Sequence, residues 1–544
     1  ESVVLAQHMK MARLTTTGKA SAAAVSPDGK LVVHVVDDGK QESLWIRQVS
    51  TSSNVQIIPP AEVNYLGLTF SPGGDYLYYI LWDRKSFYVL YQMPMLGGAA
   101  KRLIQDIDSN VTFSPDGKQY AFLRGYPTQG KFELLVANAD GTAERSLATR
   151  GLVSGPSGDP AWSPDGKIIV YPVENTDANG DFTSLFAVPV AGGSEKSIGS
   201  QRWSGVGRMA WLRDGSGFLV IAKEDVASPS QIWYVSYPAG KVRRITQDLN
   251  DYQDLTLTAD SSALVTVQSE QVSNIWTAPN ETPSRASQVT TGKFDGLNSL
   301  SWTPEGKIVY DSAARGHLDL WVSDSNGTGQ KQLTADAGNN SWPSVSPDGR
   351  YVVFVSDRTG TNHLWRIDID GSNATQLTQG PGESRPHCLP DSQWVAFNSK
   401  LSHRPVMKVP IMGGEAIKLG IIDAGGALAI SPDGKSIAAT HWELANVNTA
   451  IYTLGGGEPS KLLDFAGYYL RWTPDGRSIA FVDDRNPSAI ISQPIDGGSP
   501  RQLADFKPDR IFSFAWSHDG KQLAVARGTL THDVILITDF LDQR

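Results

Sequence analysis

The 544-residue chain has few of the groups that crosslink a protein or hold it to a membrane or a nucleic acid. Its single cysteine, Cys388, excludes internal disulfides and cysteine-based zinc sites, and we interpret it as a small buried side chain. No run of eighteen apolar residues occurs, so we expect no membrane insertion within this chain. The formal net charge is −9 and no five Lys or Arg residues stand together, which disfavours nucleic acids and anionic membranes as partners.

Signatures of catalysis are also missing. A serine hydrolase carries Gly-x-Ser-x-Gly on a strand-to-helix turn, and the nearest strings, at Gly155–Gly158 and Trp203–Gly205, break that pattern. The 9 histidines are scattered, with no His-Glu-x-x-His and no pair four residues apart, so their spacing does not favour a histidine-based metal site. We therefore predict that the chain is not an enzyme.

What the chain does have is a repeat. The phrase Ser-Pro-Asp-Gly-Lys occurs intact at Ser26–Lys30, Ser114–Lys118, Ser163–Lys167 and Ser431–Lys435. Eight variants bring the total to twelve, and the residue at the proline position is number 27, 72, 115, 164, 213, 259, 304, 347, 390, 432, 474 and 518. The mean spacing, 491/11 or about 45 residues, is that of one four-stranded β-propeller blade. The sequence predicts an all-β propeller fold with twelve four-stranded blades.

The repeated phrase is suited to a tight turn between the first two strands of a blade. Proline presets its backbone φ, aspartate suits the next position, and glycine takes the left-handed geometry that closes the turn. We therefore interpret Asp28 and its counterparts as turn residues and not as catalytic acids. A third strand with Leu/Ile-Trp follows, as at Leu44–Ile46, and a short fourth strand with Gln-Leu-Thr, as at Gln332–Thr334. Such blades must stack face to face around an axis to bury both apolar faces.

The two ends of the chain bear on how the blades close. Arg13–Thr15 is a spare strand before the first repeat, and the last repeat stops without a fourth strand. One twelve-bladed ring could be closed by the N-terminal strand alone. We prefer two tandem six-bladed propellers, over residues 12–286 and 287–544, with the strand at 12–17 as the clasp that completes blade six and Gln288–Thr290 completing blade twelve. The stretch Pro279–Ser287, rich in Pro, Asn and Ser, is the expected linker.

The turn phrase, the Leu/Ile-Trp strand, the Gln-Leu-Thr strand and Ser356–Gly360 resemble the TolB-like, WD40-like propeller repeat, over essentially residues 12–544. The arrangement is also similar to the C-terminal half of bacterial, acidobacterial-type membrane-anchored serine/threonine kinases, although the chain has none of the kinase motifs. The second resemblance implies a periplasmic or cell-surface sensor or scaffolding part of a larger bacterial signalling protein. Since the chain starts at Glu1 without an initiator methionine, we expect it to be a processed or shortened piece.

Two other functions stay open. Peptidases of the tricorn and prolyl oligopeptidase kinds carry similar propellers as substrate gates, so a gating module of a protease is the alternative function. A stand-alone propeller enzyme such as a lactonase or lyase would need Glu, Asp and His clustered at the channel, which the scattered histidines do not favour.

One loop has the residue spacing of a calcium site. Asp177, Asn179 and Asp181 stand at the alternate positions that open an EF-hand-like oxygen cage, but Val188 occupies the position of the closing acid. We expect an ordinary turn here and no cofactor, with Ca²⁺ as the minority alternative.

Propellers usually bind at the ring mouth, where the residues just ahead of each innermost strand converge. The polar and aromatic residues predicted to lie there are Asp159, Arg208, Asn298, Trp342, Arg385, His387 and Arg471. Arg and Trp are enriched at the energetic centres of protein interfaces. We therefore predict a non-catalytic module that binds a protein, a peptide or a small ligand at the propeller mouth.

Overall fold

The computed structural model describes residues 9–82, 87–126, 129–151, 158–177, 180–224, 228–314, 316–335, 338–399, 405–421, 426–443, 446–483 and 486–541. These residues form antiparallel sheets and one short 3-10 helix, η2 (Pro283–Arg285). No α-helix occurs among them, and hence none that could cross a membrane. The chain divides into two compact units, which we call the first ring (Glu1–Asp177, Asp181–Glu270 and Thr531–Arg544) and the second ring (Ala178–Gly180 and Gln271–Leu530). The predicted division between 286 and 287 stays a prediction.

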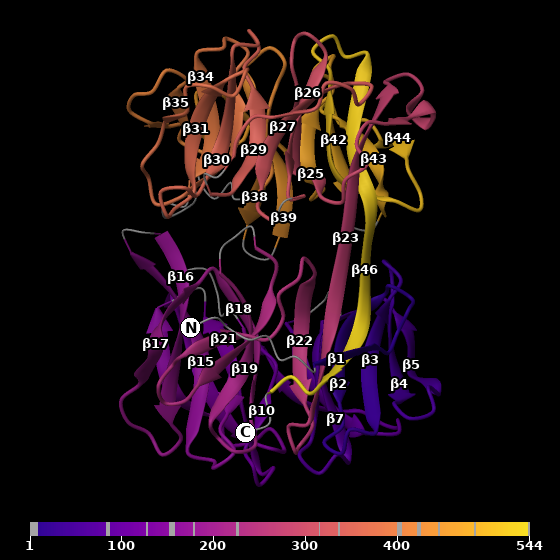
Figure 1. The fold of residues 1–544 in the computed structure, drawn as a ribbon, viewed down its shortest axis with the longest axis vertical. Helices are drawn as coiled ribbons and strands as arrows, with labels where there is room; N and C mark the ends of the chain where they lie inside the picture. Colours follow the sequence, from indigo (N-terminus) through magenta and orange to yellow (C-terminus); the bar gives the residue numbers. More distant parts are fainter. Residues whose placement is uncertain are drawn as a thin grey trace. The chain divides into compact units, whose positions relative to one another are not determined.

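The first ring contains five complete four-stranded blades (Figure 1). They are β2 (Ala20–Val25), β3 (Leu31–Asp37), β4 (Glu42–Gln48) and β5 (Asn54–Ala61); β6 (Asn64–Phe70), β7 (Tyr76–Trp82), β8 (Val89–Pro94) and β9 (Lys101–Gln105); β10 (Thr112–Phe113), β11 (Gln119–Tyr126), β12 (Lys131–Asn138) and β13 (Arg145–Gly151); β14 (Ala161–Trp162), β15 (Ile168–Asp177), β16 (Gly180–Pro189) and β17 (Lys196–Trp203); and β18 (Gly205–Trp211), β19 (Gly217–Lys223), β20 (Gln231–Ser236) and β21 (Val242–Arg244).

The second ring also contains five complete blades. They are β25 (Asp295–Trp302), β26 (Lys307–Ser312), β27 (Asp319–Asp324) and β28 (Lys331–Gln332); β29 (Asn340–Val345), β30 (Tyr351–Ser356), β31 (His363–Asp368) and β32 (Thr375–Gln376); β33 (Glu383–Cys388), β34 (Trp394–Ser399), β35 (Val406–Pro410) and β36 (Ile417–Lys418); β37 (Leu428–Ile430), β38 (Ser436–Glu443), β39 (Asn446–Thr453) and β40 (Lys461–Leu463); and β41 (Tyr468–Trp472), β42 (Ser478–Asp483), β43 (Asn486–Pro494) and β44 (Arg501–Asp505).

The sixth blade of each ring comes from the remaining strands, which form one sheet: β1 (Lys10–Arg13), β22 (Asp251–Leu257), β23 (Ala263–Pro279), β24 (Ser287–Gln288), β45 (Arg510–Trp516) and β46 (Gln522–Thr538). β23 and β46 are 17 residues long, and each passes from one ring into the other, at Glu270/Gln271 and Leu530/Thr531 respectively. The first ring is therefore completed by β22, the first half of β23, the second half of β46 and β1. The second ring is completed by β45, the first half of β46, the second half of β23 and β24.

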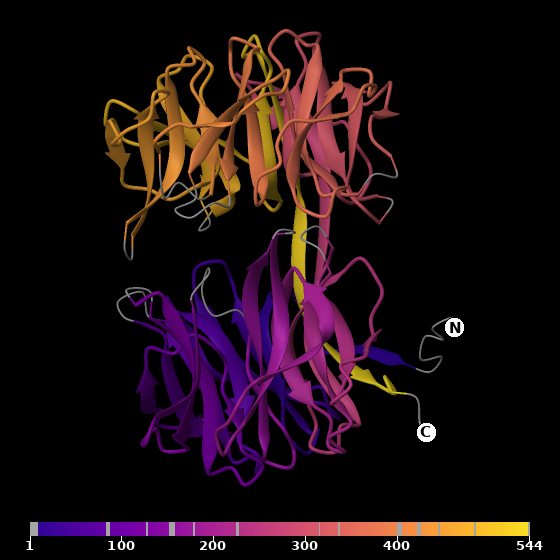
Figure 2. The same cartoon turned by 90° about the vertical axis from the view of Figure 1, so that its left-hand side faces the viewer.

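This exchange of third strands was not predicted from the sequence, which placed Ile275-Trp276 in blade six and Val534–Ile537 in blade twelve. The core contacts show the exchange directly. Val534 packs with Val265 and Val267 in the first ring, whereas Ile275 packs with Ala524 and Ala526 in the second. Figure 2 shows the yellow end of β46 beside the indigo β1, whose Lys10–Arg13 pair with Thr538–Ile535. The physical reason is that neither 17-residue strand contains a turn, so each strand continues where other blades reverse.

The innermost strands show that each set of six blades closes on itself. In the first ring β22 contacts both β18 and β2, and in the second β45 contacts both β41 and β25, so the last blade meets the first in each. The twelve-blade count and the tandem of two six-bladed rings are thus confirmed, and the single twelve-bladed ring is not what forms.

The repeated phrase forms the turn that its residues predict. In the first blade, Asp28 Oδ1 accepts hydrogen bonds from Ser26 Oγ at 2.7 Å and from the Lys30 amide at 3.1 Å, and Gly29 has φ +72°. These two bonds are the main reason that the pKa of Asp28 is lowered. The turn aspartates thus have a backbone role in the fold.

Candidate binding site

The residue five positions before each proline position lies in an innermost strand or just ahead of it. In the first ring these residues are Ala22, Gly67, Asn110, Asp159, Arg208 and Asp254. In the second ring they are Ser299, Trp342, Arg385, Ala427, Tyr469 and Ser513. The two rings therefore present different chemistry at the same place in the repeat.

In the first ring, charged residues at this position pair with each other. Arg208 Nη1 donates to Asp254 Oδ1 at 2.5 Å, and its Nη2 donates across the ring to the Leu68 carbonyl at 2.7 Å and to Thr69 Oγ1 at 2.8 Å. Both side chains of the ion pair are 8% exposed. The arginine thus joins the fifth blade to the sixth and the second, and both of its terminal nitrogens have partners within the ring.

Asp159 is held in the same first-ring network. Its two carboxylate oxygens accept hydrogen bonds from the amide and the side chain of Asn110, both at 2.8 Å. Burial raises the pKa of Asp159, and the charge of Arg208 opposes that rise. Gly67 leaves the room for this arrangement, because a Cβ there would lie 1.9 Å from Asn110 Oδ1. Asp159 and Arg208 have structural contacts inside the ring, and a binding role for them stays a prediction.

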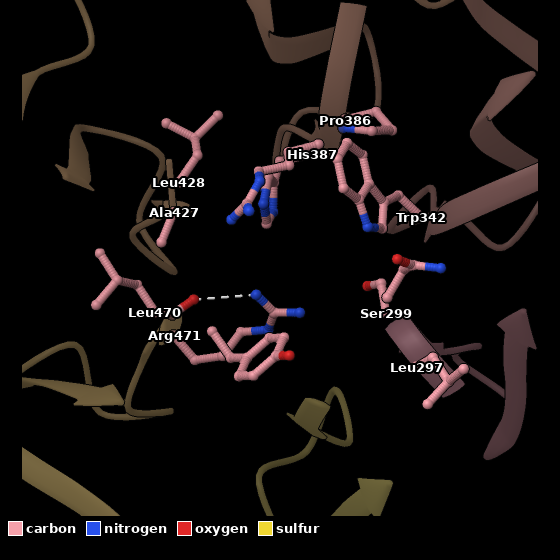
Figure 3. Close-up of a pocket in the computed structure, with 12 residues that line it drawn as sticks. Leu297, Ser299, Trp342, Pro386, His387, Ala427, Leu428, Leu470 and Arg471 are labelled. Atoms are coloured by element: carbon pink, nitrogen blue, oxygen red, sulfur yellow. Dashed lines mark hydrogen bonds between the residues drawn. The ribbon is translucent and has the colours of Figure 1, made fainter. Parts of the chain in front are cut away.

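In the second ring the corresponding region holds a cavity of about 120 Å³ (Figure 3). Its lining comes from five blades and consists of Leu297, Asn298, Ser299, Trp342, Arg385, Pro386, His387, Ala427, Leu428, Tyr469, Leu470 and Arg471. Five of the seven residues predicted for the propeller mouth are in this group. None of the twelve lining residues is acidic.

The backbone around the cavity is bent to direct side chains into it. Trp342, Arg385 and Tyr469 have φ of +53°, +54° and +56°, in the left-handed region that non-glycine residues seldom occupy. At each of them the pairing of the innermost strand with its neighbour shifts register. Left-handed backbone at such residues costs free energy and is concentrated at functional sites. Asp254, at the equivalent position of the first ring, has the same bulge with φ +59°, so the bulge is a feature of the repeat that turns this residue toward the channel in both rings.

Two arginines give the cavity its charge. Arg471 Nη1 donates to the Leu470 carbonyl at 3.0 Å (Figure 3), and the guanidinium carbon of Arg385 lies 5.2 Å from the centroid of the Trp342 ring. Burial, followed by the charge of Arg385, lowers the pKa of Arg471 to about 10. Burial also lowers the pKa of Arg385, against the opposing effect of Tyr469. Both side chains are cationic at pH 7.

His387 lies in the same cavity as a neutral side chain. Burial first, and then the charges of Arg471 and Arg385, lower its pKa to about 3. At pH 7 the imidazole therefore carries one N–H donor and one acceptor nitrogen. One ring nitrogen is hydrogen-bonded to the backbone of Leu428, so the imidazole offers the cavity one further nitrogen and no charge.

A buried carboxyl behind the cavity supports its backbone. Asp311 on β26 is fully buried, and its two oxygens accept hydrogen bonds from the amides of Asn298 and Trp342, both at 3.3 Å. Burial raises the pKa of Asp311 from 3.8 to about 7, against the effect of these bonds.

We expect this carboxyl to make the protein less stable as the pH rises. Between the unfolded-state pKa of 3.8 and the folded-state pKa of about 7, the folded state binds more protons, so the free energy of unfolding falls through this window and levels off above it. The shift corresponds to roughly 4 kcal/mol. In Asp311→Asn this slope is absent, so denaturation from pH 4.5 to 7.5 should show wild type losing stability relative to the variant.

The exposed turn residue Asp433 provides the control for that experiment. Hydrogen bonds from Ser431 and the Lys435 amide lower its pKa below 3.8. Asp433→Asn should therefore differ from wild type by a constant amount between pH 4.5 and 7.5. Parallel pH profiles of wild type and Asp311→Asn would contradict the prediction.

Several cavity residues were not predicted from the sequence, among them Ser299, Ala427 and Tyr469. A usable signal exists three positions before the proline position, where ten repeats have Ser, Thr or Ala and two have His387 and Arg471. Both exceptions line the cavity. Comparing the repeats position by position would have pointed to this ring.

Of the three residues predicted to bind calcium, the structure describes the side chain of Asp177. Asn179 and the side chain of Asp181 lie outside the described residues. The carboxylate of Asp177 is bound by Arg202, whose Nη1 and Nη2 donate to Oδ2 and Oδ1 at 2.6 and 3.0 Å. No group of three or more potential metal ligands occurs among the described residues. The calcium site stays a prediction.

The family of the chain follows from its match to known propellers. The family model of the TolB beta propeller domain matches residues 4–211 and 285–419, well over half of the sequence. The chain belongs to the TolB β-propeller family. The Tol-Pal system protein TolB of Francisella tularensis is 23% identical over 246 residues, which is 44% of this chain and 55% of that protein. An uncharacterized protein of Agrobacterium fabrum is 35% identical over 100 residues, 18% of this chain and 34% of that protein.

The chain thus spans from about a third to about half the length of these two relatives. Among solved structures, the tricorn protease resembles it with a TM-score of 0.34 and 11% identity, covering 90% of this chain and 62% of that one. This likeness is too low to bear on function. The resemblance to the propeller region of membrane-anchored kinases stays a prediction.

Proposed function

We propose that this TolB-family chain is a binding module whose recognition site is the channel of the second ring. The observation that carries the proposal is the convergence of Trp342, Arg385, His387 and Arg471 from three blades on one cavity. These side chains are half-buried, and aromatic and arginine side chains at the centre of a concave site are typical of protein and peptide recognition. We propose further that the ligand is a protein or peptide and that the module lies outside the cytoplasm, in a larger bacterial signalling protein.

A peptide array tests the site. The full chain is applied to short immobilised peptides of random sequence, together with Ser299→Phe, which places a large side chain in the cavity, and Ser372→Phe, the same change at an exposed turn of the same ring. We expect a set of peptides that wild type and Ser372→Phe retain and Ser299→Phe does not. Equal retention by all three, or no retained peptide, would refute the proposal, provided that thermal melting shows both variants folded.

The gating module of a protease stays the alternative, and the two proposals differ in what the channel does to a peptide. A recognition site holds it, with a Kd that depends on the cavity residues. A gate passes it, so saturable retention on the array counts against gating.

A further inference from the structure

The two rings differ in how they treat an arginine at the same place in the repeat. Arg208 and Arg385 both stand five residues before the proline position of their repeat. Arg208 is paired with Asp254, which holds that position in the next blade. The next blade after that of Arg385 has Ala427 there, and a cavity adjoins it. The second ring therefore has the cation of the first without its carboxylate.

Nothing else in the described part of the chain supplies that negative charge. Among the described residues, no carboxylate forms an ion pair with Arg385 or Arg471, and the Arg471 side chain donates one hydrogen bond, to the Leu470 carbonyl. The nearby Asp311 has its oxygens directed at the amides of Asn298 and Trp342. Keeping two cations together in a partly desolvated site is costly unless an anion joins them.

We propose that the second ring binds a carboxylate group in this cavity, beside Ala427, with Arg385 and Arg471 as its two cationic partners. The inference deepens the proposed function and rests on it for the location of the site. A planar carboxylate matches the paired N–H donors of a guanidinium, and a desolvated site strengthens those bonds. A cavity of about 120 Å³ holds the carboxylate and a short stem, and the Trp342 ring provides an apolar surface for that stem.

The smallest probe of this site is propionate, compared with the neutral propionamide of the same shape. The quantity to measure is the melting temperature of the full chain with each compound, at constant ionic strength set with sodium chloride. Propionate should raise the melting temperature in a saturable way and propionamide should not, because ligand binding to the folded state stabilises it. Arg385→Gln and Arg471→Gln should each weaken the response at least tenfold. The exposed arginine of the same ring, in Arg477→Gln, should leave it unchanged.

A second variant tests the comparison between the rings. Ala427→Asp introduces a carboxylate at the position that Asp254 holds in the first ring, so it should raise the melting temperature of the ligand-free protein and abolish the propionate response. Should Ala427→Asp fail to fold, Ser299→Asp places the carboxylate on another wall of the same cavity, with the same expectation. An unchanged propionate response in a folded Asp variant would overturn the proposal, as would equal responses to propionate and propionamide in wild type.

The carboxylate could belong to an acidic side chain or to the C-terminus of a peptide, and peptides distinguish these two sources. Peptides with an acidic side chain and an amidated C-terminus are compared with peptides that lack acidic side chains and have a free C-terminus, and binding by either class through the two arginines supports the proposal. If array peptides bind in the cavity but neither class depends on Arg385 or Arg471, the carboxylate inference fails while the proposed function stands. If no peptide binds at all, the proposed function fails first.

Discussion

A variant that ends at Leu530 should lose the first ring and keep the second. The segment Thr531–Arg544 belongs to the first ring, where Val534, Ile535, Ile537 and Phe540 are at most 3% exposed. Burying each such side chain contributes about 1.5–3 kcal/mol, so losing all four costs roughly 6–12 kcal/mol, an upper estimate. That is comparable with the whole stability of a typical domain.

Polar contacts add to this cost. The buried Asp533 carboxylate accepts hydrogen bonds from Thr15 Oγ1 at 2.9 Å and from Arg13 Nη1 at 3.1 Å, and the Leu14 amide donates to the Val534 carbonyl at 2.7 Å. Removing the segment therefore also releases β1 from its place in the ring.

Hydrogen exchange read out by peptide mass is the measurement. In the shortened variant, peptides from residues 9–270 should lose protection, while peptides from 271–530 keep it. A variant that ends at Leu541 retains all of β46 and is the control, with protection like that of the full chain. Loss of protection confined to 271–530 would contradict the strand assignment.

The second large effect is expected at Arg208. Arg208→Met leaves the Asp254 carboxylate buried without its cation and removes the hydrogen bonds to Leu68 and Thr69. Removing one partner of a buried ion pair lowers the free energy of unfolding by about 3–5 kcal/mol. Denaturant unfolding followed by hydrogen exchange in the first ring should show a loss of that size.

The double variant Arg208→Met/Asp254→Asn separates the ion pair from the packing. It removes the uncompensated charge, and the amide oxygen of the substituted side chain can still accept from the Ala23 amide, as Asp254 Oδ2 does at 2.9 Å. We expect it to be more stable than Arg208→Met alone. Arg213→Met, at an exposed site of the same repeat, should be close to wild type. If Arg208→Met were as stable as wild type, the ion pair would not contribute to the stability of the first ring.

How much of the fold and of the candidate site could be predicted from the sequence depends on how far apart along the chain the interacting residues lie. The turn at Asp28 is made by residues within five positions of each other, so its chemistry is readable locally and twelve copies of it give the blade count. The residues at the propeller mouth lie at fixed distances along the chain from this turn, which is why Trp342, Arg385 and His387 could be predicted. Local patterns do not reveal which ring a strand joins. That choice depends on Ser269–Ser273 continuing β23 without a turn and on contacts such as Val534 with Val265, over 260 residues apart.

Predicting the contents of the two channels requires the alignment of the repeats together with the closure of each ring. Arg208 and Arg385 hold equivalent places in their repeats and look alike in the sequence. Their difference is set by what the following blade offers, Asp254 in one ring and Ala427 in the other. Only the ring closure tells which residues face each other, and so which arginine has a partner in the protein and which faces a cavity.

The exchanged strands also set an order of events during synthesis. The last core residues of the first ring, from Val534 to Phe540, are translated some 250 residues after β24, the final strand that precedes the second ring's own blades. At about 5–20 residues per second, the ribosome takes roughly 10–50 s to cover that distance. Throughout this interval the edge of β23 in the first ring lacks its pairing partner, the second half of β46. We therefore expect the sixth blade of the first ring to stay incomplete until the C-terminal segment has been translated.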